Sequence, residues 1–196
     1  MKTILTLLLL CVVSSIFGQS SIEWTGDYEL QLEDFRSPET EINEAINSYA
    51  IFSGSKMEFS YQMTRAQFML TKNFNSKVST IFNRNTAVLT APDSVTAQEL
   101  VNFGQYSFDL TELYSRKFRK ELYEQKGAFS DASFFKTIYE ELQEQMNAEL
   151  ARVLKTIELG KKSNLLKEER QKVLAQIEQL SDFCKACKPP RKKKKR

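Results

Sequence analysis

The first half of the chain alternates apolar and polar residues with a period of two, the pattern typical of half-buried strands. This alternation predicts strands over residues 27–35, 57–63, 67–71 and 78–82. Residues 41–49 fit either a short helical turn or a loop that leads into a strand. Together these segments predict a mostly antiparallel sheet of four or five strands.

Apolar residues in the second half recur at steps of three and four, which indicates helices. Thr96 and Glu99 fit a capping box, in which each side chain satisfies a free amide of the first helical turn. The helix that they begin is expected to run to about Glu124 and to stop near Gly127.

Two further helices are predicted beyond this point. The second begins at Ser130 or Asp131 and ends at Gly160, since glycine takes the left-handed conformation that helix ends favour. The third begins at Ser163 or Asn164. The apolar stripe of the second helix comprises Phe135, Ile138, Leu142, Met146, Leu150, Val153 and Ile157. These last two helices are expected to pair as an antiparallel hairpin.

A strand-rich half followed by a helical half predicts the α+β class. We expect the N-terminal, mostly antiparallel sheet to pack on the first long helix, followed by the helical hairpin and a disordered basic tail. In this interpretation residues 19–160 form one α+β domain, 161–187 hold the C-terminal helix, and 188–196 form the tail.

The first eighteen residues (1–18) have the pattern of a secretory signal peptide. Lys2 supplies the positive charge, residues 4–13 form the apolar core, and Gly18 is a small residue before a cut ahead of Gln19. The apolar run is too short for a transmembrane helix, which needs about 20 residues. The protein is therefore predicted to be exported, to the periplasm or to the outside of the cell.

Charge is distributed unevenly along the chain. Without Lys2, the residues up to Cys187 carry 20 basic and 25 acidic side chains, a net charge of −5, whereas seven basic residues follow Cys187 and give +7. The terminal run consists of Arg191, Lys192, Lys193, Lys194, Lys195 and Arg196. It predicts contact with an anionic surface through charge, without recognition of a specific nucleic acid. The alternative is a tail that has no role, or one that folds back on the acidic body.

Cys184 and Cys187 stand three residues apart near the end of the chain. They are either a pair of terminal thiols or a local disulfide, which an oxidising compartment would permit. A thioredoxin-type role would need the motif at the start of a helix in a βαβ unit, whereas here it follows a helix. A zinc site would need further ligands, and the sequence supplies neither a second such pair nor any histidine.

The segment Phe103-Gly-Gln-Tyr-Ser-Phe-Asp109 lies within the first predicted helix. A zinc-binding H-E-x-x-H helix places two imidazoles four residues apart on one face, with a glutamate that activates a water molecule. Phe103 and Ser107 have this separation, but a phenyl ring offers no lone pair and a hydroxyl is a poor zinc ligand. Gly104, at the glutamate position, cannot take up a proton.

Residues 99–122 nevertheless resemble the active-site helix of a family of secreted, zincin-like bacterial proteins assigned as peptidases. That family carries H-E-Q-x-H-F-D followed by an E-L-Y-x-R-K-like stretch. Phe103, Gly104 and Ser107 stand here in place of its two histidines and its glutamate. The positions that still fit the family are Gln105, Phe108, Asp109, Glu112, Leu113, Tyr114, Arg116 and Lys117.

The resemblance reaches from about residue 22 to residue 160 and implies an α+β fold with the first helix packed on the sheet. It also implies that Phe103 fills the volume of the missing metal, so no metal and no other cofactor are expected. Gly104 costs a helix about 0.8–1 kcal/mol relative to alanine, and we therefore expect a strand or an insert to pack closely against it. On periodicity alone, the aromatic residues of this helix are simply its apolar face, and Glu112 with Arg116 is an ion pair of the scaffold.

Three functions follow from these patterns. The first is a non-catalytic pseudo-peptidase that acts as a binding or structural module of the cell envelope, with the C-terminal helices as the contact surface for a protein partner. The second is a hydrolase of another type that reuses the cleft with carboxylates, or with Gln105, Asp109 and Tyr114. The third is a surface protein that binds polyanions through its tail. The absence of histidine excludes Ser-His and Cys-His nucleophilic catalysis.

Overall fold

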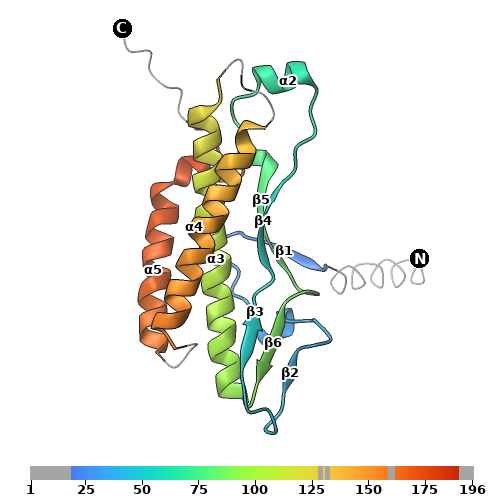
Figure 1. Ribbon diagram of the computed structural model, residues 1–196, viewed down its shortest axis with the longest axis vertical. Coiled ribbons are helices and arrows are strands. Elements are labelled where there is room, and N and C mark those ends of the chain that lie inside the picture. The colour runs from blue at the N-terminus through green and yellow to red at the C-terminus, as the bar shows by residue number, and fades with distance from the viewer. Residues whose placement is uncertain (1–18, 128–129, 131–132, 159–161, 190–196) are drawn as a thin grey trace, which may run out of the picture.

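The computed structural model shows an α+β protein, with small sheets on one side of a long helix and two further helices on the other (Figure 1). It describes residues 19–127, 130, 133–158 and 162–189. The α+β class predicted from the sequence is confirmed.

Several predictions fall on residues that the structure does not describe. These are the signal peptide, the cap residues Asp131 and Gly160, and the basic run from Arg191 to Arg196. Within the described residues, none of the helices combines the length and the apolarity that a membrane span needs.

The strands form two sheets of three strands each, not one larger sheet. The first sheet has the order β1 (Ser21–Glu23), β5 (Val78–Asn83), β4 (Ser55–Phe59), and both of its pairings are antiparallel. Strand β5 matches the strand predicted from residue 78 onward, and β4 covers the beginning of the one predicted from residue 57.

The second sheet has the order β2 (Glu41–Ile42), β6 (Val88–Ala91), β3 (Ala50–Phe52). Strand β2 runs parallel to β6, and β3 runs antiparallel to it. The chain passes from β3 to β4 through Gly54, whose φ is +68°, a conformation that L side chains rarely adopt. A Cβ there would lie 2.6 Å from the carbonyl oxygen of Asn83, so the crossing between the sheets requires glycine.

The strand predicted over residues 27–35 is wrong. The segment is extended without a ladder partner and ends in the 3-10 helix η1 (Leu32–Asp34). The carboxylate of Asp34 accepts hydrogen bonds from the backbone amide of Gln31 and from the hydroxyl of Tyr28. A side chain thus satisfies the backbone locally, where a strand would have needed a neighbouring strand.

The strand predicted over residues 67–71 is also wrong, because these residues belong to helix α2 (Arg65–Leu70). Thr64 and Gln67 form a capping box: the hydroxyl of Thr64 accepts from the amide of Gln67, and the side chain of Gln67 accepts from the amide of Thr64. The capping box favours a helix here, although the apolar alternation is typical of a strand.

The long helices are α3 (Ser94–Gln125), α4 (Phe134–Thr156) and α5 (Ser163–Gln179). Helix α3 begins earlier than predicted, because Asp93 caps it by accepting from the amide of Thr96 at 2.8 Å. The predicted capping box of Thr96 and Glu99 is therefore wrong. Helix α5 begins at the predicted Ser163.

Helix α3 is the centre of the molecule. Helices α4 and α5 lie side by side, and both pack mainly on α3 (Figure 1). One apolar cluster joins α3 to α4 and α5 and extends to α2, β4 and the start of β5, and a second lies between the first half of α3 and the strands. A helix covered on both sides must bury its polar residues as well, and buried polar groups need partners within the protein.

Candidate functional site

The two positions that would have held zinc ligands are part of the packed interior. The ring of Phe103 is 6 % exposed, and its centre lies 6.1 Å from that of Tyr106. The hydroxyl of Ser107 is 2.9 Å from the hydroxyl of Ser53, which precedes the turn into β4. Among the described residues, no carboxylate hydrogen-bonds to the hydroxyl of Ser107.

Gly104 lies directly under an aromatic ring. A Cβ at this position would come within 2.8 Å of Cζ of Phe35, a distance that real side chains essentially never show. Phe35 follows η1, so the close packing expected at Gly104 is present and comes from the segment inserted between β1 and β2. A glutamate could not occupy this position unless the ring of Phe35 moved.

The carboxylate of Asp109 joins three parts of the chain. Its Oδ1 accepts from the indole Nε1 of Trp24 at 2.8 Å and from the amide of Gln105 at 3.1 Å. Its Oδ2 accepts from Nε of Arg170 at 2.6 Å. The side-chain oxygen of Gln105 accepts in turn from the backbone amide of Leu30 at 2.8 Å. Asp109 thereby connects α3 to the N-terminal segment and to α5.

Arg170 also pairs with Glu29, at 2.7 Å from Nη2 to Oε1. Burial lowers the pKa of Arg170, but the hydrogen bonds to Glu29 and Asp109 outweigh burial and leave this pKa raised. The guanidinium of Arg170 therefore keeps its positive charge at any ordinary pH.

A second buried cluster surrounds Glu112, one turn further along α3. Its Oε1 accepts from Nε of Arg116 at 2.8 Å and from Nη1 of Arg119 at 2.9 Å. Its Oε2 accepts from the hydroxyl of Thr80 on β5 at 2.7 Å. The i,i+4 pair of Glu112 and Arg116 predicted from the sequence is present, but it is buried and shared with a second arginine.

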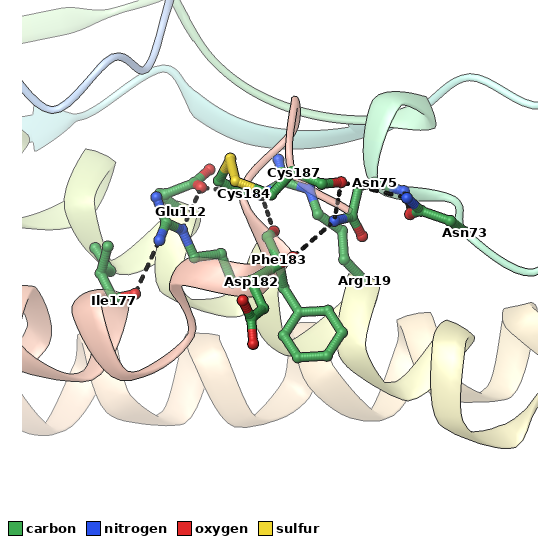
Figure 2. Close-up of a disulfide and its surroundings, with 10 residues drawn as sticks. Asn73, Asn75, Glu112, Arg119, Ile177, Asp182, Phe183, Cys184 and Cys187 are labelled. Carbon is green, nitrogen blue, oxygen red and sulfur yellow. Dashed lines mark hydrogen bonds and ion pairs between the residues drawn. A yellow bond between two sulfur atoms is a disulfide. The ribbon is translucent and has the colours of Figure 1, made fainter. Parts of the chain in front are cut away.

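Both arginines also donate to backbone carbonyls. Arg116 donates from Nη1 to Ile177 of α5 at 2.9 Å. Arg119 donates from Nη2 to Val78 at 2.9 Å. It also donates from Nη1 to Phe183 of the 3-10 helix η3 (Ser181–Phe183) at 3.1 Å (Figure 2). The cluster thus ties α3 to the sheet, to the end of α5 and to the segment that follows.

Cys184 and Cys187 form the disulfide that the sequence suggested. The amide of Cys187 donates to the carbonyl of Cys184 at 3.0 Å, so the bridge closes a single tight turn. Asn75 donates from Nδ2 to the carbonyls of Cys187 and Asp182 at 3.0 and 3.2 Å, and Asn73 donates to the same Cys187 oxygen (Figure 2). We call residues 184–187 the disulfide turn.

A cavity of about 320 Å³ lies between the disulfide turn and the Glu112 cluster. Its walls include Trp24, Thr80, Glu112, Arg116, Arg119 and Cys184. Sequence analysis had not assigned Trp24, Thr80 or Arg119 to a site. Of these three, only Arg119 could have been found from the sequence. It stands seven residues after Glu112, which is about two helical turns and places both residues on the same face of the helix.

The other predicted neighbours of the motif are core residues. Phe108 packs against Phe82 in the sheet-side cluster, with the ring centres 5.8 Å apart. Tyr114 lies on the α4 side, where Nζ of Lys117 stands 4.1 Å from the centre of its ring. Burial raises the pKa of Tyr114 and lowers the pKa of Lys117.

Across the part of the chain that the structure describes, no three side chains of His, Cys, Asp or Glu are placed to hold a metal ion together. Comparison with models of protein families, with curated proteins and with solved structures gives no match for this chain. The resemblance to zincin-like peptidases therefore stands on the motif positions of the sequence alone.

Proposed function

We propose that the protein is an exported, non-catalytic counterpart of a zincin-like peptidase, which acts as a binding or structural module of the cell envelope. One observation carries this proposal: the polar residues that remain of the motif are engaged in contacts within the fold. Asp109 and Glu112, the two carboxylates, hold Arg170, Arg116 and Arg119.

These contacts argue against a catalytic role for either carboxylate. A general base must be free to take a proton from a substrate or from water. Asp109 is 2 % exposed and Glu112 is 3 % exposed, and each accepts several hydrogen bonds from charged or neutral donors. Phe35 occupies the space above Gly104 that a catalytic glutamate would need.

The hydrolase built on Gln105, Asp109 and Tyr114 has less support. The side chains of Gln105 and Asp109 hydrogen-bond to each other. Tyr114 packs instead in the cluster on the α4 side, under Lys117. The three side chains therefore do not converge on one point where a substrate would react.

A shallow groove supports a role in binding. It has a volume of about 520 Å³ and lies where α4 and α5 flank α3. Leu113, Ile138, Leu142 and Leu180 line it together with lysine, glutamate and glutamine side chains. This mixture of apolar and polar residues is common at protein–protein contacts, and it agrees with a partner that docks on the C-terminal helices.

The zinc content of the protein tests this proposal. The chain should be purified without a histidine tag, with the Cys184–Cys187 bridge intact, equilibrated with zinc and analysed for the element. We expect well under one equivalent and no zinc-dependent cleavage of peptides. One equivalent of tightly bound zinc that persists in a C184S/C187S variant would overturn the proposal, because the thiols could not account for it.

The charge of the C-terminal tail supports a second candidate function, binding to an anionic surface. Because Pro189 is buried, the test deletes residues 190–196 only. We expect this deletion to abolish salt-dependent binding to heparin. A matched variant with Lys192–Lys195 replaced by glutamine keeps the length of the tail and should bind as weakly as the deletion. Binding that the deletion leaves unchanged would refute this function.

A further inference from the structure

Two buried arginines share one buried carboxylate. Arg119 is 1 % exposed, Arg116 is 8 % exposed, and both donate to Oε1 of Glu112. The cluster therefore carries one excess positive charge. Asp109, one turn away on α3, is paired with Arg170, and Glu23 in the wall of the adjoining cavity is paired with Lys185. A buried charge without a counter-charge is costly, so the cluster favours the entry of an anion.

The hydrogen-bond donors of the two guanidinium groups point to the same conclusion. Each guanidinium has five N–H donors. Arg116 donates two hydrogen bonds and Arg119 donates three, which leaves five of the ten N–H groups without a partner among the described residues. One of them, Nε of Arg119, is fully buried. Buried donors are rarely left unpaired in folded proteins.

Both arginines line the 320 Å³ cavity under the disulfide turn. The charged residues of its wall are Arg116, Arg119 and Lys185 against Glu23 and Glu112, again an excess of one positive charge. The indole ring of Trp24 lies 5.5 Å from the Arg116 guanidinium and forms an apolar part of the same wall. The cavity thus combines donors, positive charge and an aromatic surface.

We propose that this cavity binds a small organic carboxylate. Its two oxygens accept from the unpaired N–H groups of Arg116 and Arg119, while its carbon chain lies against Trp24 and the disulfide turn. A guanidinium matches the planar carboxylate with two parallel hydrogen bonds. A single excess charge suits a monoanion better than a phosphate dianion. This inference rests on the proposed function, because it gives the binding module a ligand.

Trp24 makes the test direct, because it is the only tryptophan of the chain. Its fluorescence should be followed while sodium acetate is added to the full chain at constant ionic strength. We expect a saturable change with acetate and none with acetamide, the neutral isostere. An acetylated dialanine with a free C-terminus, compared with its amide, distinguishes the end of a peptide from a free acid as the source of the carboxylate.

Single substitutions test whether the fluorescence change arises from binding in this cavity. R116Q should weaken the binding of acetate about tenfold or more, as expected for the loss of a charge-assisted pair. R152Q removes an arginine that pairs on the surface with Glu149 of α4 and Glu169 of α5, and it should bind like the wild type. If R116Q does not fold, K185Q changes an exposed charge of the same wall and should weaken binding about twofold to threefold.

The inference is overturned if folded wild-type protein shows no saturable change, if acetamide acts like acetate, or if inorganic phosphate binds more tightly than acetate. Binding that R116Q leaves unchanged overturns it as well. None of these outcomes bears on the zinc test. Conversely, a bound zinc ion would remove the proposed function and leave the response of Trp24 to acetate as measured.

Discussion

Nε of Arg170 on α5 lies 2.6 Å from Oδ2 of Asp109 on α3, although the two residues are 61 positions apart in the sequence. Asp109 also accepts from Trp24, 85 positions away. One buried carboxylate therefore holds the beginning of the described chain and its last long helix against the same turn of α3.

Replacing Asp109 with asparagine should destabilise the protein by about 2–4 kcal/mol, because the partly buried guanidinium of Arg170 and the indole of Trp24 lose a charged acceptor. Urea unfolding followed by Trp24 fluorescence measures this change. D109N/R170Q completes a double-mutant cycle, and it should be less unstable than the sum of the single variants. E140Q, at an exposed pair with Lys136, is the control, and a D109N effect as small as that of E140Q would contradict the role given to Asp109.

Replacing Gly104 with alanine tests the contact with Phe35. Helix propensity alone would stabilise the variant by about 0.8–1 kcal/mol. We expect instead a net destabilisation of about 1–3 kcal/mol, because the new Cβ collides with the Phe35 ring. F35L in the G104A background should restore part of the loss. G127A is the matched control, because its Cβ would meet the hydroxyl of Ser130 at 3.7 Å and no other atom of the described residues within 4 Å. A stabilised G104A variant would show that the close contact is absent.

Replacing Asn75 with alanine should loosen the disulfide turn. Asn75 is 1 % exposed and donates to the carbonyls of Asp182 and Cys187, so the variant leaves two acceptors without this donor. We expect a loss of about 1–3 kcal/mol and faster amide exchange at Cys187. N102A removes an asparagine with a single exposed partner and should leave that exchange unchanged. Equal rates of amide exchange at Cys187 in N75A and wild type would contradict the proposal that Asn75 holds the disulfide turn in place.

Stability should fall with acid partly through the surface ion pairs of Glu149 on α4 and Glu169 on α5. The hydrogen bond from Arg152 lowers the pKa of Glu149, and the hydrogen bonds from Lys172 and Arg152 lower the pKa of Glu169. Both carboxylates therefore bind protons more readily in the unfolded chain. Their contribution is complete above the unfolded pKa of about 4.3 and is lost as pH falls through the lower folded values.

R152Q isolates this effect. The free energy of unfolding should decline by about 0.5–1 kcal/mol less in R152Q than in the wild type between pH 5 and acid, since these pairs are partly solvated. Urea unfolding at a series of pH values measures it. K136Q, which alters an exposed pair on α4, should follow the wild type. If the free energy of unfolding falls equally with pH in R152Q and wild type, the ion pairs of Arg152 do not contribute to stability.

Periodicity predicted most of the helical half, because a helix that packs on one face records that face in its sequence. The start of α5 at Ser163 and the end of α3 before Gly127 agree with the structure. In the strand-rich half, periodicity led to two wrong strand predictions. Residues 27–35 and 67–71 alternate as strands do, but side-chain contacts and a capping box satisfied their backbone instead. Apolar alternation reports burial, and it does not report the partner of each backbone amide.

The sequence by itself determined the α+β class, and the lack of histidine ruled out an imidazole site. It left open whether Cys184 and Cys187 are free thiols or a local disulfide, and the structure shows the disulfide. Only the tertiary structure decided what the remaining polar residues of α3 contact. Arg170 and Trp24 reach Asp109, and the cavity under the disulfide turn forms, through contacts between residues far apart in the chain. Local spacing cannot encode these contacts, because they depend on which faces of α3 the sheets and α5 come to cover.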